Sequence, residues 1–156
     1  MKVAIAFGSN LGDRRAAIAF AAERLSPAIS GLTLSGLIET NPEGEGLDTQ
    51  PLYLNGVGVG ETSLDARSLL ELLLAIEREY GRERPYPGAP RTIDLDLILY
   101  GDRVIHEPGL SVPHPRFRNR FFVLGPLAEV APDLVDPETG LRVGELLRKL
   151  LQDETR

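Results

Sequence analysis

The chain has 156 residues, a length typical of one domain with a hydrophobic core of its own. Apolar residues make up 42% of it, which is typical of globular proteins and argues against extensive disorder. The net charge of −6 argues against general binding to nucleic acid or to a membrane surface. The absence of cysteine excludes disulfides, thiol catalysis and zinc–thiolate sites.

The sequence shows no signal for a membrane or an export pathway. No apolar run approaches the roughly 18 residues of a membrane span. Residues 1–8 combine a charge with an apolar stretch that is too short for a signal peptide. We therefore expect a cytoplasmic protein with no membrane or nucleic-acid partner. A net charge well away from zero, without long apolar surface runs, predicts a monomer.

The first half of the chain alternates strand and helix signals. Residues 2–8 predict a strand, and residues 8–13 a turn. A helix follows to about Leu25, and its apolar positions are Ile18, Ala21 and Leu25. Residues 29–39 predict a second strand, and residues 40–50, rich in glycine, proline and acids, predict a loop.

A third strand and a second helix come next. Residues 52–61 alternate cleanly, with Tyr53 and Asn55 on one face of the predicted strand. Ser63 is the expected cap of the helix, and Gly81 is expected just past its end. Apolar residues recur at helical spacing between them, at Leu69, Leu73, Ile76 and Tyr80.

The second half contains the strongest strand signal, residues 92–100, after a charged, proline-rich loop at 82–91. Val104 and Ile105 are expected to pair with this strand as a hairpin, and helices are expected near 118–129 and 143–151. The order strand, helix, strand, strand, helix, strand is the ferredoxin-like pattern. We expect an α+β fold in one domain (1–156): an antiparallel sheet with helices over one face and C-terminal helical additions.

Two aspartates share one face of the predicted strand at 92–100. Ile93, Leu95, Leu97 and Leu99 point to one side, so Asp94 and Asp96 point together to the other, about 7 Å apart. Like charges on one sheet face repel, and divalent cations would offset that cost. The alternatives are a solvated face or pairing with nearby arginines. If a metal binds, nucleotide phosphates are the expected co-ligands.

Two arginine-rich segments flank these aspartates in the sequence. Arg82, Arg84 and Arg91 lie in a proline-rich loop, which either closes over phosphates or is a solvated loop. The second segment contains His114, Arg116, Arg118 and Arg120. Arg120 can fork onto a carbonyl-rich ring or a phosphate. Phe122 beside it either stacks on a flat ligand or packs in the core.

These segments together resemble the 6-hydroxymethyl-7,8-dihydropterin pyrophosphokinase family, from Gly8 to about Pro132. The resemblance is carried by Gly8-Ser9-Asn10, Tyr53-Leu54-Asn55, Glu77 with Gly81-Arg82, Pro90-Arg91-Thr92-Ile93-Asp94-Leu95-Asp96, and Val112-Pro113-His114-Pro115-Arg116 with Arg120 and Phe122. It implies transfer of pyrophosphate from MgATP to the pterin hydroxymethyl group, with release of AMP, in folate biosynthesis.

The resemblance also implies roles for individual residues. Asp94 and Asp96 match the residues that bind two Mg²⁺ ions. The pterin would be bound by Thr40, Pro42, Tyr53, Asn55, Arg120 and Phe122. The nucleotide would be bound by Glu77, Arg82, Arg84, Arg91, Leu97, Ser111 and His114. The catalytic set would be Arg82, Arg91, Asp94 and Asp96.

Some positions depart from the family pattern. The chain has no tryptophan, although relatives often carry one just before the Gly-Pro-Arg of the 82–91 loop, and Ala89 replaces the usual glycine there. Two other kinds of function remain as alternatives. A regulatory ligand-binding module would bind without releasing AMP, and an aldolase acting on dihydroneopterin would need a general base and no nucleotide.

Overall fold

The helices and strands follow the predicted order. The computed structural model describes residues 1–41, 52–82 and 92–154. The strands are β1 (Lys2–Ser9), β2 (Ile29–Leu34), β3 (Ile38–Thr40), β4 (Tyr53–Thr62), β5 (Asp94–Tyr100), β6 (Ile105–Glu107) and β7 (Leu110–Val112). The helices are α1 (Arg14–Leu25), α2 (Ala66–Arg82), α3 (Phe121–Val130) and α4 (Val143–Glu154), with a 3₁₀ turn η1 (Phe117–Asn119) before α3.

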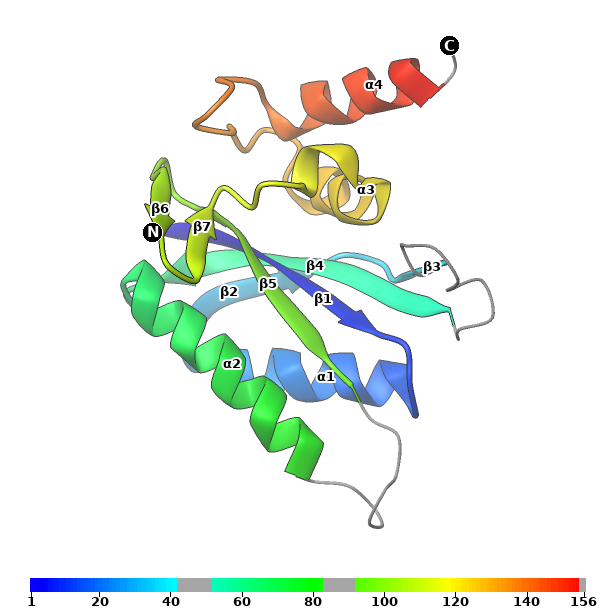
Figure 1. Cartoon of the computed structure of the whole chain (residues 1–156), viewed down its shortest axis with the longest axis vertical. Coiled ribbons are helices and arrows are strands. Elements are labelled where there is room, and N and C mark those ends of the chain that lie inside the picture. The colour runs from blue at the N-terminus through cyan, green and yellow to red at the C-terminus, as the bar shows by residue number, and fades with distance from the viewer. Residues whose placement is uncertain (42–51, 83–91, 155–156) are drawn as a thin grey trace.

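The main sheet has the order β2-β4-β1-β5, with β3 also paired to β4, and all of these pairs are antiparallel. Helices α1 and α2 cover one face of this sheet, while α3 covers the other and α4 stacks on α3 (Figure 1). This arrangement confirms the ferredoxin-like prediction, including the C-terminal helical additions. Within the parts of the chain that the structure describes, no helix has the length and apolar character needed to span a membrane.

The two faces of the sheet hold two separate cores. The core under α1 and α2 contains the predicted apolar faces of both helices: Ile18, Ala21, Leu25, Leu69, Leu73, Ile76 and Tyr80. The core under α3 and α4 is formed by Ala4, Val57, Val59, Ile98, Leu99, Phe117, Val123, Leu124, Leu127, Val143 and Leu146. Helices therefore cover both faces of the sheet.

A β-bulge in β5 corrects the predicted alternation of residues 92–100. The pairing with β1 steps from Ala4–Leu99 to Ile5–Leu97, which leaves Ile98 as the extra residue. Leu97 therefore packs under α1 and α2, whereas Leu99 packs under α3. The aspartates precede the bulge, and the prediction that they share one face, opposite Leu95, is unaffected.

The hairpin prediction was wrong. Val104 and Ile105 do not pair with the strand at 92–100; Ile105 pairs with Val112 in a separate two-stranded sheet formed by β6 and β7. The turn between them contains Gly109, whose φ of 75° is the left-handed conformation that glycine adopts without strain. Pro108-Gly109 was therefore the turn signal of this hairpin.

Three smaller boundaries also differ from the prediction. The expected strand at 29–39 is divided into β2 and β3. Asp65, rather than Ser63, accepts the backbone N–H of Ser68 at 2.7 Å and so caps α2. Gly81 lies inside α2, which ends at Arg82, and does not have the positive φ of a helix-terminating glycine.

Gly60 of β4 lies close to the edge strand β2. A Cβ atom at Gly60 would lie 2.5 Å from Ile29 Cγ2 and 2.8 Å from the Ser30 carbonyl oxygen. Because backbone is one of the obstacles, we expect Gly60→Ala to lower the free energy of unfolding by about 2 kcal/mol. Urea denaturation at equilibrium measures this.

Gly81 provides the matched control for Gly60. A Cβ atom at Gly81 has nothing within 4 Å. Alanine is favoured over glycine in helices, so Gly81→Ala is expected to raise the free energy of unfolding by about 0.5 kcal/mol. Equal effects of the two substitutions would contradict the steric explanation.

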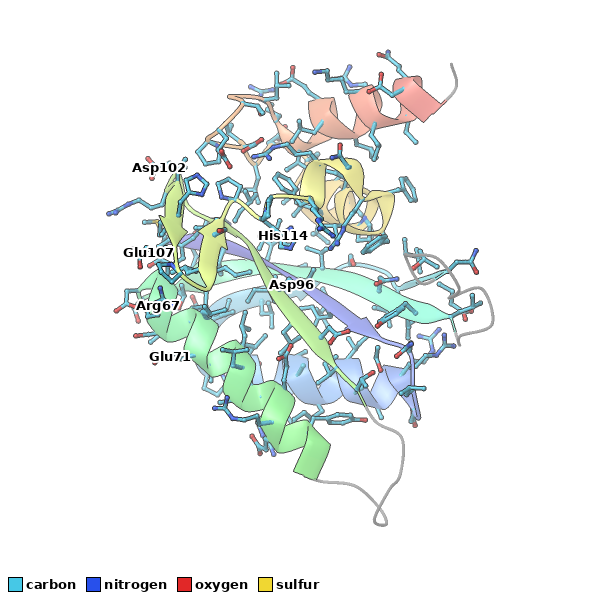
Figure 2. The ribbon with its side chains drawn as sticks, viewed as in Figure 1. Arg67, Glu71, Asp96, Asp102, Glu107 and His114 are labelled. Carbon is cyan, nitrogen blue, oxygen red and sulfur yellow. The ribbon has the colours of Figure 1, made fainter. Side chains whose placement is uncertain are left out.

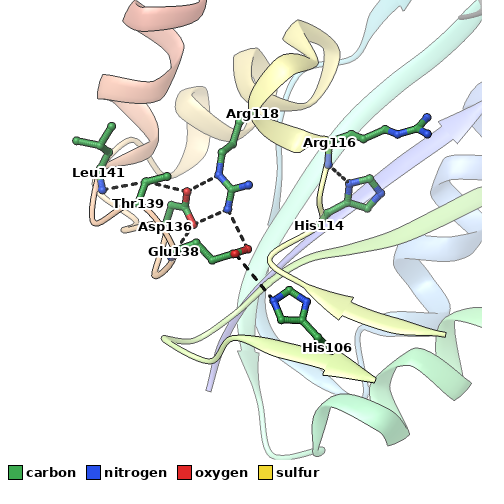
Figure 3. A network of polar contacts seen from close by, with 8 residues as sticks. All are labelled: His106, His114, Arg116, Arg118, Asp136, Glu138, Thr139 and Leu141. Atoms are coloured by element: carbon green, nitrogen blue, oxygen red, sulfur yellow. Dashed lines mark hydrogen bonds and ion pairs between the residues drawn. The ribbon is translucent and has the colours of Figure 1, made fainter. Parts of the chain in front are cut away.

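A buried ion pair connects η1 to the segment between α3 and α4 (Figure 3). Arg118 donates from Nε to Asp136 Oδ2 at 2.5 Å and from a terminal nitrogen to Oδ1 at 3.0 Å, and Asp136 is fully buried. The same carboxylate accepts the Thr139 hydroxyl at 2.8 Å and the backbone N–H of Glu138 at 3.1 Å. This network attaches the segment between α3 and α4 to η1, the turn that precedes α3.

Candidate active site

A cavity of about 330 Å³ opens between the sheet and the N-terminal half of α3. Its wall is formed by residues of β1, β3, β4, β5 and α3, together with the segments that follow β1 and β3. The lining residues are Ala6, Phe7, Gly8, Asn10, Thr40, Asn41, Tyr53, Asn55, Gly56, Asp94, Asp96, Arg120, Phe122 and Val123. Seven of these are residues that the sequence predicted: Thr40, Tyr53, Asn55, Asp94, Asp96, Arg120 and Phe122.

The floor of the cavity follows the strand register. Gly8 of β1 pairs with Asn55 on one side and with Asp94 on the other, so these three residues form one row across the sheet. Asp96 belongs to the next row of the same face, opposite Ala6. A Cβ atom at Gly8 would lie 3.4 Å from Asn55 Oδ1 and 3.6 Å from Tyr53 Cδ1. Glycine therefore keeps the floor open between the amide and the carboxylates.

Asp94 and Asp96 carry negative charge into this cavity. Loss of solvation in the cavity, and then the neighbouring charge of Asp96, raise the pKa of Asp94 above its ordinary value. The Tyr53 hydroxyl donates to Asp94 Oδ2 at 3.4 Å. Burial, followed by the Asp94 charge, raises the pKa of Tyr53. The site is therefore under electrostatic strain that a bound cation would relieve.

The donor set of these two aspartates fits magnesium. Within residues 1–41, 52–82 and 92–154, no group of three or more His, Cys, Asp or Glu side chains is placed to hold a metal ion. A closed, all-protein metal site is thus not formed by the described side chains. Magnesium commonly binds one or two carboxylates and completes its coordination with water and substrate phosphates, which matches an open pair of carboxylates.

The part of the cavity wall formed by Asn55, Arg120 and Phe122 suits a flat, polar ring. Asn55 Nδ2 donates to Thr40 Oγ1 at 2.7 Å, and this bond fixes the orientation of the Asn55 amide at the cavity wall. Phe122 is half-buried at the start of α3, with the Arg120 guanidinium 5.5 Å from the centre of its ring. An aromatic face, a guanidinium and an oriented amide together provide stacking and hydrogen bonding.

Glu77 and Leu97 lie near this site but not in the cavity. Glu77 Oε2 accepts the backbone N–H of Leu95 at 2.7 Å, between the two aspartates along β5. Burial, and secondarily the charges of Asp94 and Asp96, raise the pKa of Glu77. Leu97 is 5% exposed in the core under α1 and α2, so its side chain does not line the cavity.

His114 lies near Asp96 on the side of the sheet that α3 covers (Figure 2). Its backbone N–H donates to the Ile98 carbonyl at 2.9 Å, and its Nδ1 accepts the backbone N–H of Arg116 at 3.1 Å. Burial, and then Arg120 and Arg116, lower the pKa of His114, although Asp96 acts in the opposite direction. A neutral imidazole that accepts at Nδ1 carries its proton on Nε2.

Of the remaining predicted residues, the structure places only Ser111 fully, and Ser111 does not line the cavity. Ser111 is exposed on β7, where it pairs with His106. Arg82 is the last residue of α2, and its side chain is outside the described part of the chain. Pro42, Arg84 and Arg91 lie outside the described residues altogether, so their roles stay predictions.

Two asparagines of the cavity wall were not among the predicted site residues. Asn10 accepts the Thr92 hydroxyl at 3.1 Å, while Ser9 Oγ donates to the Thr92 carbonyl at 2.7 Å. These two bonds connect the end of β1 to the entry of β5. Asn10 belongs to the Gly8-Ser9-Asn10 motif, and Asn41 lies between two predicted residues, Thr40 and Pro42. Their positions in the sequence could therefore have identified both asparagines as site residues.

Fold and site together define a ferredoxin-like protein whose cavity places paired carboxylates beside a wall of aromatic, guanidinium and amide side chains. The family model of 7,8-dihydro-6-hydroxymethylpterin-pyrophosphokinase (HPPK) matches residues 4–132. The chain belongs to this family.

Curated relatives include two bacterial pyrophosphokinases and a fungal folic acid synthesis protein. A Pseudomonas aeruginosa protein named 2-amino-4-hydroxy-6-hydroxymethyldihydropteridine pyrophosphokinase is 42% identical over 149 residues, which cover 94% of this chain and 90% of that protein. A Synechocystis protein of the same name is 48% identical over 101 residues, covering 65% of this chain and 52% of that protein. The Pneumocystis carinii folic acid synthesis protein fol1 is 39% identical over 155 residues, 99% of this chain but 21% of that protein.

The chain therefore spans about half of the Synechocystis relative and about a fifth of the Pneumocystis one. Among solved structures, wild-type HPPK-DHPS of Plasmodium falciparum superposes with a TM-score of 0.75 at 14% identity. That match covers 97% of this chain and 45% of the other, and it supports the fold.

Proposed function

We propose that this protein transfers pyrophosphate from MgATP to the hydroxymethyl group of 6-hydroxymethyl-7,8-dihydropterin, releasing AMP, as a step of folate biosynthesis. One observation supports this most strongly. Asn55, Gly8 and Asp94 lie in a single row across three paired strands, so a ring-binding amide and a metal-binding carboxylate share one cavity.

The pterin half of the proposed site is the wall formed by β3, β4 and α3. The ring stacks between Tyr53 and Phe122, and Asn55 pairs with its hydrogen-bonding edge. Thr40, which accepts from the Asn55 amide, sets the direction of that edge contact. Arg120 and Pro42 complete the proposed pterin contacts.

The phosphate half is organised by Asp94 and Asp96. When bound there, two Mg²⁺ ions would neutralise charge on the ATP phosphates and polarise the attacking hydroxyl. Glu77 holds the backbone of Leu95 between the two aspartates and so fixes their spacing. His114, neutral and with its proton on Nε2, can donate to a phosphate oxygen. The proposed cationic contacts to the triphosphate are Arg82, Arg84 and Arg91. Ser111 and Leu97 are proposed to belong to the surroundings of the nucleotide.

In the proposed reaction the pterin hydroxymethyl oxygen attacks the β-phosphorus of ATP. A new bond forms between that oxygen and the β-phosphorus, and the bond from the β-phosphorus to the oxygen bridging to the α-phosphorus breaks. AMP leaves with the bridging oxygen, and the hydroxyl proton passes to water. Positioning of the two substrates and neutralisation of the phosphate charge provide most of the acceleration.

Phosphorus NMR of the protein with MgATP and 6-hydroxymethyl-7,8-dihydropterin tests the proposal. The expected products are AMP and a pterin diphosphate, and EDTA is expected to abolish both. ADP as the product would indicate ordinary kinase chemistry. Turnover of dihydroneopterin without nucleotide would indicate an aldolase, and ligand binding without any turnover a regulatory module.

We also propose that residues 1–156 act as one domain and as a cytoplasmic monomer. The four-stranded order β2-β4-β1-β5 supports a single domain because it joins strands from both halves of the chain. A net charge of −6 and the absence of cysteine support a monomer in a reducing compartment. Light scattering coupled to size-exclusion chromatography measures the oligomeric state.

A further inference from the structure

The passage from β2 to β3 contains a bulge opposite Gly56 of β4. Ser35 donates its backbone N–H to the Val57 carbonyl at 2.8 Å, and Val57 in turn donates its N–H to Ser35 Oγ at 2.9 Å. The next backbone pair joins Ile38 to Asn55. Gly36 and Leu37 therefore stand as two residues opposite the single Gly56.

Packing fixes one side of this bulge. A Cβ atom at Gly56 would lie 2.6 Å from Leu37 Cδ2, so Leu37 occupies the space that a larger residue at position 56 would take. Leu37 is partly buried and packs against the core under α1 and α2. Gly36, the other bulged residue, is exposed and requires a different anchor.

Glu129 supplies that anchor from α3. Its Oε2 accepts the backbone N–H of Gly36 at 2.8 Å. Glu129 lies in the last turn of α3, which contains no basic residue. A carboxylate at the C-terminal end of a helix opposes the helix dipole, so helix stability does not account for an acid at this position. The charge-assisted bond to Gly36 does.

The bulge determines the pairing register between β3 and β4. Beyond it Thr40 lies opposite Tyr53, and from there its hydroxyl accepts the Asn55 amide. The opposite end of α3 contributes Phe122 and Val123 to the same cavity. One helix therefore contacts the bulge through Glu129 and lines the cavity through its first turn.

We propose that Glu129 is a positioning residue for pterin recognition: by holding Gly36, it fixes the register and place of β3 and hence the Thr40–Asn55 pair. This inference rests on the proposed function, because it assigns pterin to that pair. Glu129 does not line the cavity, and strands β4 and β1 lie between the bulge and β5, which carries the two aspartates. The effect is therefore expected on pterin binding and not on nucleotide binding.

The test compares Glu129→Ala, Glu129→Gln and a control, Glu23→Ala, which removes an exposed acid of α1 on the other face of the sheet. Loss of one charge-assisted hydrogen bond predicts a Kd for the pterin about five- to tenfold higher in Glu129→Ala. The Kd for a non-hydrolysable ATP analogue and kcat at saturating pterin are expected to stay within about twofold. Glu129→Gln retains an acceptor oxygen and is expected to recover most of the pterin affinity, because the hydrogen bond persists without its charge.

Amide hydrogen exchange, followed by NMR on the unliganded proteins, separates this inference from the proposed function. Glu129→Ala is expected to accelerate exchange at Gly36 and in β3 but not in β5. Unchanged pterin affinity, or equal weakening of pterin and nucleotide, would overturn the positioning role. A wild-type protein that binds no pterin would overturn the proposed function and this use of β3, while the exchange rates would still report whether Glu129 holds the bulge.

Discussion

Asp96→Asn is expected to lower kcat by on the order of 10³, a loss comparable to removing a principal source of transition-state charge stabilisation. The substitution keeps the size of the side chain and removes one of the two negative charges of the proposed Mg²⁺ site. It also removes a charge that raises the pKa of Asp94. The folded protein without metal is therefore expected to be as stable as the wild type or more stable.

Steady-state kinetics at saturating MgATP, together with thermal unfolding in EDTA, check this pair of expectations. Tyr53→Ala is the comparison: it removes a stacking surface and is expected to raise KM for the pterin about tenfold with a much smaller loss of kcat. Similar losses of kcat for the two variants would contradict the metal-binding role of Asp96. A lower melting temperature of Asp96→Asn in EDTA would indicate that Asp96 is structural.

Asp136→Ala is expected to produce the largest loss of stability, about 3 kcal/mol, because it breaks a buried ion pair and leaves its donors without their acceptor. The carboxylate that would be lost is fully buried and accepts from Arg118, Thr139 and the Glu138 backbone. For a chain of this length the melting temperature should fall by roughly 6–12 °C. Asp133→Ala, an exposed acid in the same connection, is the control and is expected to change little.

The Asp136 contribution should also depend on pH in a defined direction. Burial alone would raise the pKa of Asp136, but hydrogen bonds from Arg118, Thr139 and Glu138 outweigh it, and the pKa lies below its ordinary value. A carboxylate with a depressed folded-state pKa stabilises the protein fully above its unfolded pKa of about 3.9. That stabilisation disappears as pH falls through the folded-state pKa. The difference in melting temperature between wild type and Asp136→Ala should therefore be constant from about pH 6 to 8 and shrink in acid below about pH 4.

The regular part of the sheet could be predicted from sequence because its pattern is local. Alternation placed Asp94 and Asp96 on one face, and helical spacing identified the buried faces of α1 and α2. The register that aligns Asn55, Gly8 and Asp94 could not be read in the same way, since strand pairing joins residues far apart in the chain. The family resemblance supplied the grouping of these residues, and the strand pairs give its geometry.

The errors arose where the local pattern carries no information. Residues 97–100 are apolar at every position, so nothing in the sequence marks the bulge at Ile98 that moves Leu99 to the other face. Val104 and Ile105 were assigned to the nearest strand, although Pro108-Gly109 is the better turn signal. Asp65, and not Ser63, caps α2. Both residue types cap helices well, so the sequence alone does not decide between them and tertiary placement does.

The row formed by Asn55, Gly8 and Asp94 gives the two ends of the cavity a fixed backbone spacing. Neighbouring strands are separated by about 4.8 Å, so the backbones of β4 at Asn55 and β5 at Asp94 lie about 9.6 Å apart along the row. Backbone hydrogen bonding sets this interval, and no change of side chain can alter it. Under the proposed function, the sheet therefore sets the backbone spacing between the pterin end and the phosphate end of the cavity, and side chains at either end can change without altering that spacing.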